Sequence, residues 1–371
     1  MQQDLAYGQP PHRSVIRIGH DAVDVVRQAL VSRPAGGPVA IVADQAVVVL
    51  AGRIAHALQG VGIDARLCTM VAQERMKSLD TVGSLAAQLL AHGITRAGAV
   101  VAVGGGIVGD TAGFLAATYM RGVRCIQVPT TLLAMVDAAI GGKTAVNVVL
   151  RDGSLAKNAV GAFAMPELVV CDPATLATLP PREMQCGLAE CVKHALLADG
   201  GLAEWLAANA MAVVGKDTAA IAQLVARAAA VKVAIVDRDP TEQGERALLN
   251  LGHTYAHAIE ARHDDRIKHG EAVAIGLVAA MSVASRLGRV RHAQVEALQA
   301  LLERVGLPTT LKDLVPAPDA AATLRRCMEL DKKRAGKGLV LVLPHGPVGA
   351  GLVEAPPEEA VMAGWAAVGA A

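Results

Sequence analysis

The segment that most constrains the fold is an apolar run followed at once by a glycine turn. Residues 99–103, Ala-Val-Val-Ala-Val, predict a buried strand, and the glycines after them predict a turn that opens a helix near Val108. Gly104, Gly106 and Gly109 match the G-x-G-x-x-G pattern, in which the backbone approaches a pyrophosphate and a helix N-terminus points free N–H groups at it. This segment therefore predicts a nucleotide phosphate site at the end of a strand.

The glycine pattern alone does not define an ordinary Rossmann domain. In such a domain an acidic residue about twenty positions further on holds the ribose, and here Gln127 and Val128 fall at that position. The segment gains specificity from its continuation into residues 129–133, Pro-Thr-Thr-Leu-Leu, and then into Asp137 and a second glycine turn that ends in Lys143. A glycine turn that carries a cation favours a ligand site over a purely structural turn.

Composition narrows the class of protein. The chain has 371 residues, which favours two domains, and its 35 basic residues against 34 acidic ones give no strong field for nucleic acid or an anionic membrane. No membrane partner is expected, because we find no apolar stretch of the roughly eighteen or more residues that a bilayer crossing needs, and the N-terminus lacks the pattern of a secretory signal. We therefore expect a cytoplasmic protein whose six cysteines, none in a C-x-x-C pair, are buried free thiols.

The order of predicted elements changes near the middle of the chain. Expected strands at 15–18, 39–43, 64–70 and 99–103 alternate with expected helices at 46–59 and 79–92, a rhythm typical of a parallel α/β layer. Further on, helical periodicity covers 183–198, 201–235, 245–262, 270–287 and 292–305, with one strand-like run at 338–343 and a loose C-terminal end. The sequence thus predicts an α/β Rossmann-like domain, residues 1–180, and an all-α domain, residues 181–371, joined through the loop-rich segment 147–181.

Metal-ligating residue types gather in the helical half. His253 and His257 are spaced i, i+4 and so lie on one helix face, and His269 begins the next expected helix. Glu190 lies on an earlier helix, with Lys193 one turn further on. A carboxylate and two imidazoles from three helices fit an open zinc site, although His253 and His257 could form the ligand pair instead.

Several polar side chains interrupt otherwise apolar helices or follow expected strands: Lys232, Arg246, Asn250, Arg121, Lys157 and Asn158. Singly, each is compatible with a solvated helix face. Together they indicate a pocket for a phosphorylated, polyhydroxylated acid, because lysine and arginine meet phosphate or carboxylate and a metal meets vicinal oxygens.

With these residues in place, the chain resembles the 3-dehydroquinate synthase family of the shikimate pathway. The resemblance runs from about Val39 to Pro344 and rests on motifs in order: GGGIVGD, RGVRCIQVPTTLL, GGKTAVN, KN-x-x-GAF, TLPPRE, GLAE-x-x-K, LLNLGHT-x-x-HAIE, HGEAVA and DKK. It implies conversion of 3-deoxy-D-arabino-heptulosonate 7-phosphate to 3-dehydroquinate and phosphate, a step in aromatic amino acid and chorismate biosynthesis. The implied route is transient oxidation by NAD, phosphate β-elimination, reduction, ring opening and intramolecular aldol closure.

The resemblance also implies which residues form the site. The metal, Zn²⁺ with Co²⁺ as the alternative, would be held by Glu190, His253 and His269. NAD would be held by Asp44, Glu74, Lys77, Gly105, Gly106, Asp110, Thr130, Thr131 and Lys143, with Lys157, Thr178 and Glu183 nearby. The substrate set would be Arg121, Asp137, Lys143, Asn158, Lys193, Lys232, Arg246, Asn250 and His257, with Lys332 or Lys333 closing the site.

The chain departs from the family pattern in one region. The link between Asn147 and Lys157 is extended through residues 148–156, and Ala164 stands where an aromatic residue often follows GAF. This departure concerns the loop near the nicotinamide and leaves the chemical residues untouched. A homodimer is expected from the resemblance only.

Three alternatives remain at this point. Another sugar-phosphate cyclase could act on sedoheptulose 7-phosphate or glucose 6-phosphate, or make an amino analogue of dehydroquinate, but Lys232, Arg246, Asn250 and His257 together favour an acid substrate. A metal-dependent polyol dehydrogenase would share the two-domain plan but has no need for so many phosphate-directed cations. A non-catalytic binding protein would have no use for a metal group beside a nucleotide turn.

Overall fold

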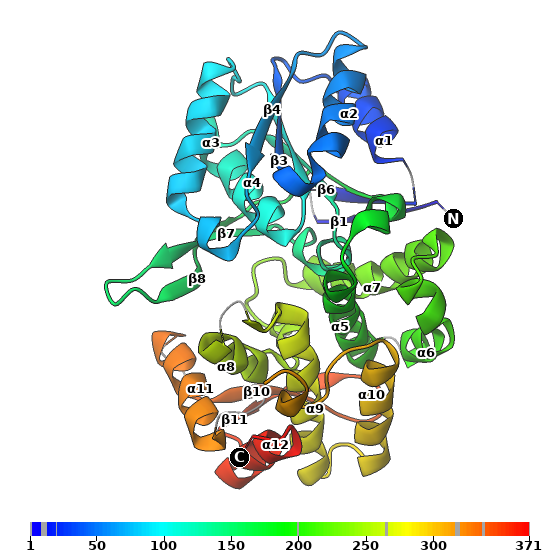
Figure 1. Ribbon diagram of the computed structural model, residues 1–371, viewed down its shortest axis with the longest axis vertical. Helices are drawn as coiled ribbons and strands as arrows, with labels where there is room; N and C mark the ends of the chain where they lie inside the picture. Colours follow the sequence, from blue (N-terminus) through cyan, green and yellow to red (C-terminus); the bar gives the residue numbers. More distant parts are fainter. Residues whose placement is uncertain are drawn as a thin grey trace. The chain divides into compact units, whose positions relative to one another are not determined.

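The computed structural model describes residues 2–8, 13–19, 21–198, 200–263, 266–315, 320–335 and 338–370, and it describes no side chain at residue 200 or at 329–335 (Figure 1). The chain divides into two compact units. The first contains Met1–Leu179 and Thr218–Thr241, and the second contains Pro180–Asp217 and Glu242–Ala371. Each is described by itself.

The first unit is built on a seven-stranded sheet within its described residues, in the order β1-β2-β9-β6-β5-β3-β4. The strands are β1 (Gln3–Tyr7), β2 (Ser14–Ile18), β3 (Val39–Asp44), β4 (Ala65–Met70), β5 (Ala99–Gly104), β6 (Arg124–Pro129) and β9 (Leu168–Cys171). Only the β1–β2 pair among these is antiparallel; the other pairs are parallel. The expected α/β layer is confirmed, and β1, β6 and β9 extend it beyond the strands that were expected.

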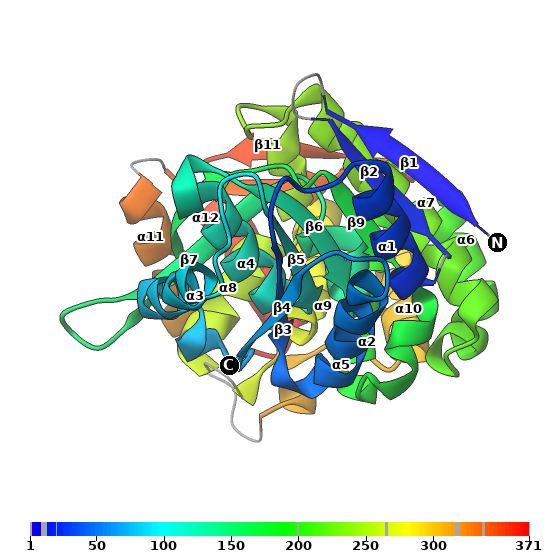
Figure 2. The ribbon, with the colours of Figure 1, turned by 90° about the horizontal axis from the view of Figure 1, so that it is seen from above.

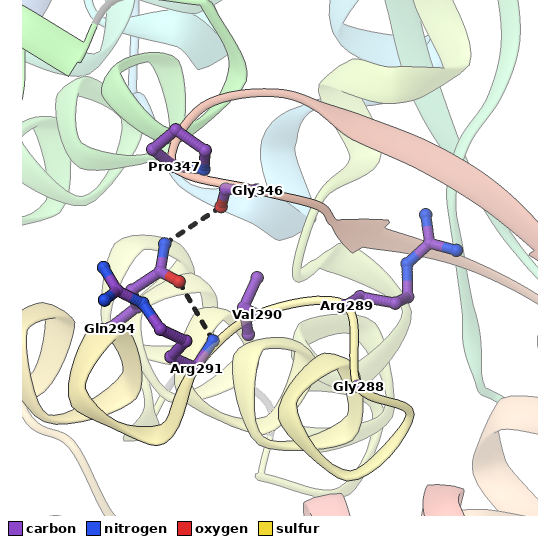
Figure 3. Close-up of a pocket in the computed structure, with 7 residues that line it drawn as sticks. All are labelled: Gly288, Arg289, Val290, Arg291, Gln294, Gly346 and Pro347. Carbon is purple, nitrogen blue, oxygen red and sulfur yellow. Dashed lines mark hydrogen bonds between the residues drawn. The ribbon is translucent and has the colours of Figure 1, made fainter.

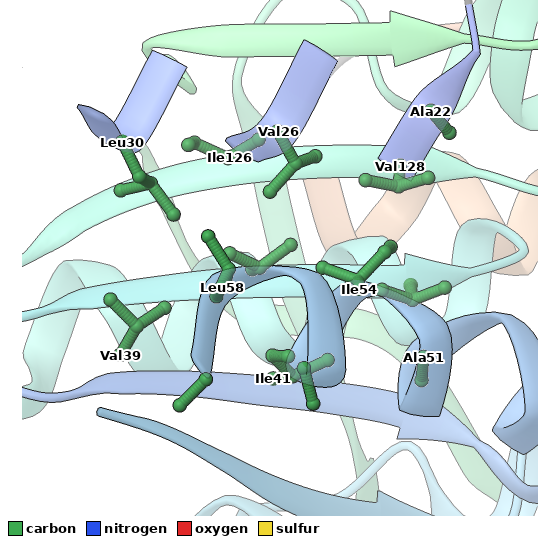
Figure 4. Packing of buried hydrophobic residues seen from close by; sticks show 14 of the residues in the cluster. Ala22, Val26, Leu30, Val39, Ile41, Ala51, Ile54, Leu58, Ile126 and Val128 are labelled. Carbon is green, nitrogen blue, oxygen red and sulfur yellow. The ribbon is translucent and has the colours of Figure 1, made fainter. Parts of the chain in front are cut away.

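Helices cover both faces of this sheet, which explains why its central strands are apolar throughout. The helices α1 (Ala22–Ser32) and α2 (Val48–Gln59) lie on one side, and α3 (Leu79–Ala91) and α4 (Gly106–Thr118) on the other (Figure 2). Along β3, Val39 and Ile41 pack beside α2 in the cluster that α1 also joins (Figure 4), whereas Val42 belongs to the cluster on the opposite face. Successive residues of a strand point to opposite faces, so a strand covered on both sides must be apolar at every position.

Two further elements complete the first unit. The strands β7 (Lys143–Val149) and β8 (Leu155–Phe163) form a separate antiparallel hairpin, where a loop-rich segment was expected (Figure 1). The helix α7 (Thr218–Arg238) packs with β1 and with the short helical segments Ala134–Ala138 and Pro173–Thr178, so it joins the first unit although it lies beyond residue 180. The single boundary predicted at 180/181 therefore misses the return of Thr218–Thr241 to the first unit.

The apolar surface of α7 accounts for that placement. Among the described residues it is the one helix long and apolar enough to match a membrane span, a match that our reading of the sequence overlooked. However, 61% of its most apolar window is buried inside the protein, which is the pattern of a core helix. Its contacts with the sheet unit keep this surface away from water.

The second unit is mainly helical. Its helices are α5 (Pro181–Ala198), α6 (Gly200–Val214), α8 (His253–His263), α9 (His269–Arg286), α10 (His292–Arg304), α11 (Ala321–Ala335) and α12 (Glu358–Ala367), joined by the hairpin β10 (Val340–Pro344) and β11 (Ala350–Glu354). The sequence predicts a loose C-terminal end, and this prediction is wrong. Trp365 on α12 is fully buried, and its ring packs 4.7 Å from that of Tyr255 on α8.

Candidate active site

The glycine turn joins β5 to α4 as the sequence predicts. The helix begins at Gly106, two residues earlier than expected, with Gly105 as its N-cap. A Cβ at Gly104 would lie 2.6 Å from Cγ2 of Val108, and one at Gly105 would lie 3.0 Å from Cγ2 of Thr131, so both positions need glycine for close packing. The turn therefore brings backbone N–H groups to the end of the strand, as an anion site requires.

The neighbouring strands bring other expected cofactor residues to the same edge. Gly104 pairs with Pro129 across β5 and β6, and the N–H of Thr130 donates to the carbonyl of Gly104 at 2.9 Å. Asp44 ends β3, the next strand on the other side of β5. In parallel sheets ligands bind beyond the carboxyl ends of the strands. Asp44, Gly105, Gly106, Thr130 and Thr131 thus belong to one edge of the sheet.

A buried network joins the next group of expected residues. The ammonium of Lys77, which is 5% exposed, donates to Oδ2 of Asp110 and to Oδ1 of Asn158, both at 2.5 Å. Burial raises the pKa of Asp110, while the charge of Lys77 and its hydrogen bond act to lower it. Glu74 is tied to the same group through Asn147, whose Nδ2 donates to its Oε1 at 2.8 Å. The structure therefore brings Glu74, Lys77, Asp110 and Asn158 together.

The second glycine turn lies near another buried lysine. Lys232 on α7 donates to the carbonyl oxygen of Asp137 at 2.7 Å and lies 2.8 Å from its Oδ1. Gly141 and Gly142 both have positive φ, 93° and 63°, and they lead into Lys143, which is exposed at the start of β7. A lysine side chain such as that of Lys143 can bind an anionic group.

Other expected residues stand apart from these clusters. Arg121 is exposed and has a positive φ of 65°, and Lys157 and Thr178 are also exposed. Glu183 belongs to the second unit, where its Oε1 lies 3.2 Å from Nζ of Lys268. The roles of these four residues stay predictions.

The second unit brings the expected metal ligands together. Glu190 lies on α5, while His253 and His269 are the first residues of α8 and α9. Their ligand atoms lie within 4.8 Å of one another: Oε1 of Glu190 is 3.6 Å from Nε2 of His253 and 3.4 Å from Nε2 of His269. His257, one turn further along α8, is outside this group of described residues, although its ring lies 5.6 Å from that of His253.

This geometry fits a zinc ion. Zinc–ligand distances of about 2.0–2.1 Å in a tetrahedron place neighbouring ligand atoms roughly 3.3 Å apart, close to the two separations from Glu190. The other ring nitrogens are engaged: Nδ1 of His253 lies 3.2 Å from the carbonyl of Leu251, and Nδ1 of His269 lies 3.3 Å from Oε2 of Glu260. Such outer contacts leave the Nε2 atoms to face the metal.

The charges around the ligands differ. Burial, and then the charge of Lys193, lower the pKa of His253 to about 3, so its imidazole is neutral. Burial also acts to lower the pKa of His269, but the carboxylates of Glu260 and Glu190 outweigh it and raise the pKa to about 10. A metal ion at this site would therefore take the place of a proton on His269.

The second unit also carries buried cations and an amide on α5 and on a short helix that contacts it. Lys193, which is 1% exposed, forms an ion pair with Glu190 one turn before it on α5. Arg246, also 1% exposed, and Asn250 lie on the short helix Glu245–Asn250, which contacts α5. Asn250 donates to Oε1 of Glu242 at 3.4 Å. Lys332 and Lys333 fall where no side chain is described.

Our reading of the sequence missed two buried polar residues that contact expected site residues. Asn147 ends the GGKTAVN motif and Glu260 ends the HAIE motif. Both positions are at most 9% exposed. For Asn147 the available signal was a polar residue inside the apolar run 145–149, because such a residue is costly to bury unless it has partners.

A separate pocket of about 300 Å³ lies in the second unit where α9 passes into α10 (Figure 3). It is lined by Gly288, Arg289, Val290, Arg291, Gln294, Gly346 and Pro347. The amide of Gln294 spans it, accepting from the N–H of Arg291 at 2.9 Å and donating to the carbonyl of Gly346 at 2.9 Å. None of its lining residues belongs to the expected site.

Comparisons with known proteins show the family of the chain. Residues 67–186 match the family described as 3-dehydroquinate synthase N-terminal, and residues 187–334 match 3-dehydroquinate synthase C-terminal. A 3-dehydroquinate synthase of Caulobacter vibrioides is 46% identical over 296 residues, which cover 79% of each chain.

Two solved structures resemble the whole chain. A 2-epi-5-epi-valiolone synthase of Streptomyces hygroscopicus, with NAD⁺ and Zn²⁺ bound, is 26% identical at a TM-score of 0.85 and covers 98% of each chain. A 2-deoxy-scyllo-inosose synthase, in complex with carbaglucose-6-phosphate, NAD⁺ and Co²⁺, has the same fold at a TM-score of 0.83 and 24% identity, over 98% of this chain and 99% of its own. These structures share the fold, and the two family matches and the Caulobacter vibrioides relative show that the chain belongs to the 3-dehydroquinate synthase family.

Proposed function

We propose that this protein converts 3-deoxy-D-arabino-heptulosonate 7-phosphate to 3-dehydroquinate and phosphate, and that it does so with NAD and a resident Zn²⁺. The observation that carries the proposal is the convergence of Glu190, His253 and His269 in a chain of this family. An open site with three protein ligands leaves room for substrate oxygens. When bound, zinc polarises a substrate hydroxyl, and NAD removes and later returns a hydride.

In the second unit, buried cations would bind and orient the substrate. Lys193 can donate hydrogen bonds to a substrate oxygen that approaches the metal ligands, because its ammonium already lies against Glu190. Arg246 has a planar guanidinium suited to a carboxylate, and Asn250 offers an amide to a hydroxyl group. His257 lies one turn beyond His253 and would contact the same oxygens.

In the first unit, the glycine turn would hold the NAD pyrophosphate and the lysines would bind anionic groups. Gly105 and Gly106 permit close approach, and the N-terminus of α4 supplies N–H groups. Lys143 would stabilise negative charge that develops as phosphate leaves, and Lys232 would hold Asp137 in place. Arg121 and Asn158 are assigned to substrate contacts with them, and Lys157, Thr178 and Glu183 to the surroundings of the cofactor.

The proton balance of the elimination needs few protein groups. An oxygen of the departing phosphate can take the proton from the carbon next to the temporary ketone, so the side chains must only bind the phosphate and the ketone. Holding the two ends of the opened chain in one site favours the aldol closure for the same reason. We extend the proposal to a homodimer in the cytoplasm that serves the shikimate pathway.

The test is phosphate release by the purified protein with catalytic amounts of NAD, with and without a chelator. We expect release from the heptulosonate phosphate, loss of release with the chelator, and recovery when Zn²⁺ is added. Sedoheptulose 7-phosphate and glucose 6-phosphate serve as matched substrates without the carboxylate. Turnover of either in preference to the acid would assign the chain to another cyclase activity and overturn the proposal.

A variant tests the metal assignment separately. Glu190→Ala removes the carboxylate that faces both imidazoles, so we expect the purified protein to lose its zinc by elemental analysis. A variant that kept stoichiometric zinc would remove Glu190 from the ligand set.

A further inference from the structure

Asn147 is a buried amide with no role in the proposed chemistry, yet each polar group of its side chain has a partner. It is 3% exposed and lies within β7. Its Nδ2 donates to the carbonyl oxygen of Glu74 at 2.9 Å and to Oε1 of Glu74 at 2.8 Å, while its Oδ1 accepts from the N–H of Asn158 at 2.7 Å. One side chain thus joins two segments that are far apart in the sequence.

The pairing of β7 with β8 is irregular at this residue. Val146 pairs with Val160, but Val148 pairs with Ala156, so Asn147 alone faces three residues, 157–159, of β8. The N–H of Asn147 does not continue the β7–β8 ladder either; it donates to the carbonyl of Lys77 at 2.8 Å. The side chain of Asn147 therefore supplies the hydrogen bond that the regular ladder lacks at the bulge.

The bulge directs Asn158, one of the expected site residues, towards Lys77 and Asp110. Asn158 has a positive φ of 53°, an uncommon backbone conformation that Asn tolerates better than most residues. In that conformation its Oδ1 accepts from Nζ of Lys77, which also pairs with Asp110. Bulges beside active sites redirect single side chains in this way.

We propose that Asn147 is a positioning residue: it holds the bulge of β8 so that Asn158 meets Lys77, and it holds the side chain of Glu74 beside them. The proposal rests on the proposed function, which assigns Glu74, Lys77 and Asn158 to NAD and substrate. It also explains how the chain tolerates the extension at 148–156. The extension forms the end of the hairpin, beyond the bulge, where Leu150 and Ser154 close the turn through a hydrogen bond of 2.8 Å.

Two substitutions distinguish the hydrogen bonds that the Asn147 side chain makes with Glu74 from the one that it makes with Asn158. Asn147→Asp keeps an oxygen for the N–H of Asn158 but replaces the donor to Glu74 with an oxygen that repels its carboxylate. Asn147→Ala removes the hydrogen bonds to both residues. We expect both variants to weaken NAD binding, measured as the dissociation constant, and only Asn147→Ala to lower kcat as well, each effect by about 10- to 100-fold.

The control is Asn209→Ala on α6. Asn209 also donates from Nδ2 to a carbonyl oxygen, that of Trp205 at 2.8 Å, but it contacts no expected site residue. We expect its kcat and NAD dissociation constant to match those of the unmodified protein. Zinc content should be unchanged in all three variants, because the metal ligands lie in the other unit.

A double-mutant cycle distinguishes positioning from general stability. If Asn147 acts through Asn158, the effect of Asn147→Ala on kcat should largely disappear when Asn158→Ala is already present. Additive effects, or an unchanged NAD dissociation constant in both Asn147 variants, would overturn the proposal. Failure of the unmodified protein to release phosphate would instead count against the proposed function, while the NAD titrations would still test Asn147.

Discussion

At the scale of single residues, the site is marked by charges that the fold buries in pairs. Lys193 lies against Glu190, and Lys232 lies against Asp137. Burying a charged pair costs desolvation free energy that the attraction between the partners often fails to offset, so such pairs are poor devices for stability alone. Their presence in Ala- and Val-rich helices is a local conflict of the kind expected at functional sites.

Lys193→Ala tests that interpretation. We expect turnover to fall to background, because the ammonium beside the metal ligands is lost, while the NAD dissociation constant stays within about two-fold, since the nucleotide residues lie in the other unit. Steady-state phosphate release and NAD titration are the two measurements. Unchanged turnover would remove Lys193 from the mechanism.

The cysteine thiols give a prediction about reactivity. Burial raises the pKa of the Cys186 thiol to about 12, so at pH 8 only a fraction on the order of 10⁻⁴ is thiolate, the form that reacts. We expect iodoacetamide to label Cys186 very slowly in the native protein up to pH 9 and rapidly after denaturation, as followed by mass spectrometry. Fast labelling of Cys186 in the native state would contradict its buried position.

At the scale of elements, two helices are held in close contact by a glycine that follows an expected metal ligand. A Cβ on Gly270, the second residue of α9, would lie 2.3 Å from the Cα of Cys186 on α5. Cys186 lies one turn before Glu190, and Gly270 directly follows His269. The separation of α5 and α9 at this contact therefore helps to set the distance between two of the expected ligands.

Gly270→Ala should force these helices apart. We expect a loss of about 1–3 kcal/mol in the free energy of unfolding, as for other overpacked contacts, together with weaker zinc binding. The control is Gly83→Ala in α3, where a Cβ would meet nothing within 4 Å, and here we expect a gain of about 0.4–1 kcal/mol. Denaturant unfolding and zinc titration are the two measurements. Equal free energies of unfolding and equal zinc affinities in the two variants would contradict the close contact between α5 and α9.

The elements that sequence reasoning found and missed differ in how local their signal is. The strands β3 and β5 are covered on both faces, and their apolar runs predict them directly. In β6, the polar residues Arg124 and Gln127 interrupt the apolar run. They are tolerated there because they donate hydrogen bonds to Glu167 and to the carbonyl of Gly109, which come from other elements. The β7–β8 hairpin is largely exposed on β8 and has no continuous apolar pattern. When two distant segments pair, neither segment needs to show a periodic pattern of apolar residues from which the pairing could be predicted.

The same reasoning applies to the site. Motif order implied the ligands Glu190, His253 and His269, and the structure brings their atoms together. It did not reveal Asn147 or Glu260, because each acts on a neighbour through tertiary contacts rather than through a spacing in the chain. A polar residue in an apolar run can be noticed in the sequence, but the neighbour that it contacts can be identified only once the fold is known.

At the scale of the whole molecule, most residues expected to hold NAD and the three expected metal ligands belong to different units of one chain. The first unit carries the glycine turn and the second carries Glu190, His253 and His269. A dehydrogenase could share this plan, but it would release NADH at the end of each turnover. The proposed synthase returns the hydride to its own intermediate, so its NAD should serve many turnovers.

The most direct test is therefore the number of 3-dehydroquinate molecules formed for each NAD supplied. With NAD limiting and the heptulosonate phosphate in large excess, we predict many products per NAD and no accumulation of NADH in the absorbance trace. One product per NAD, with a matching rise in NADH, would contradict the account and identify a dehydrogenase.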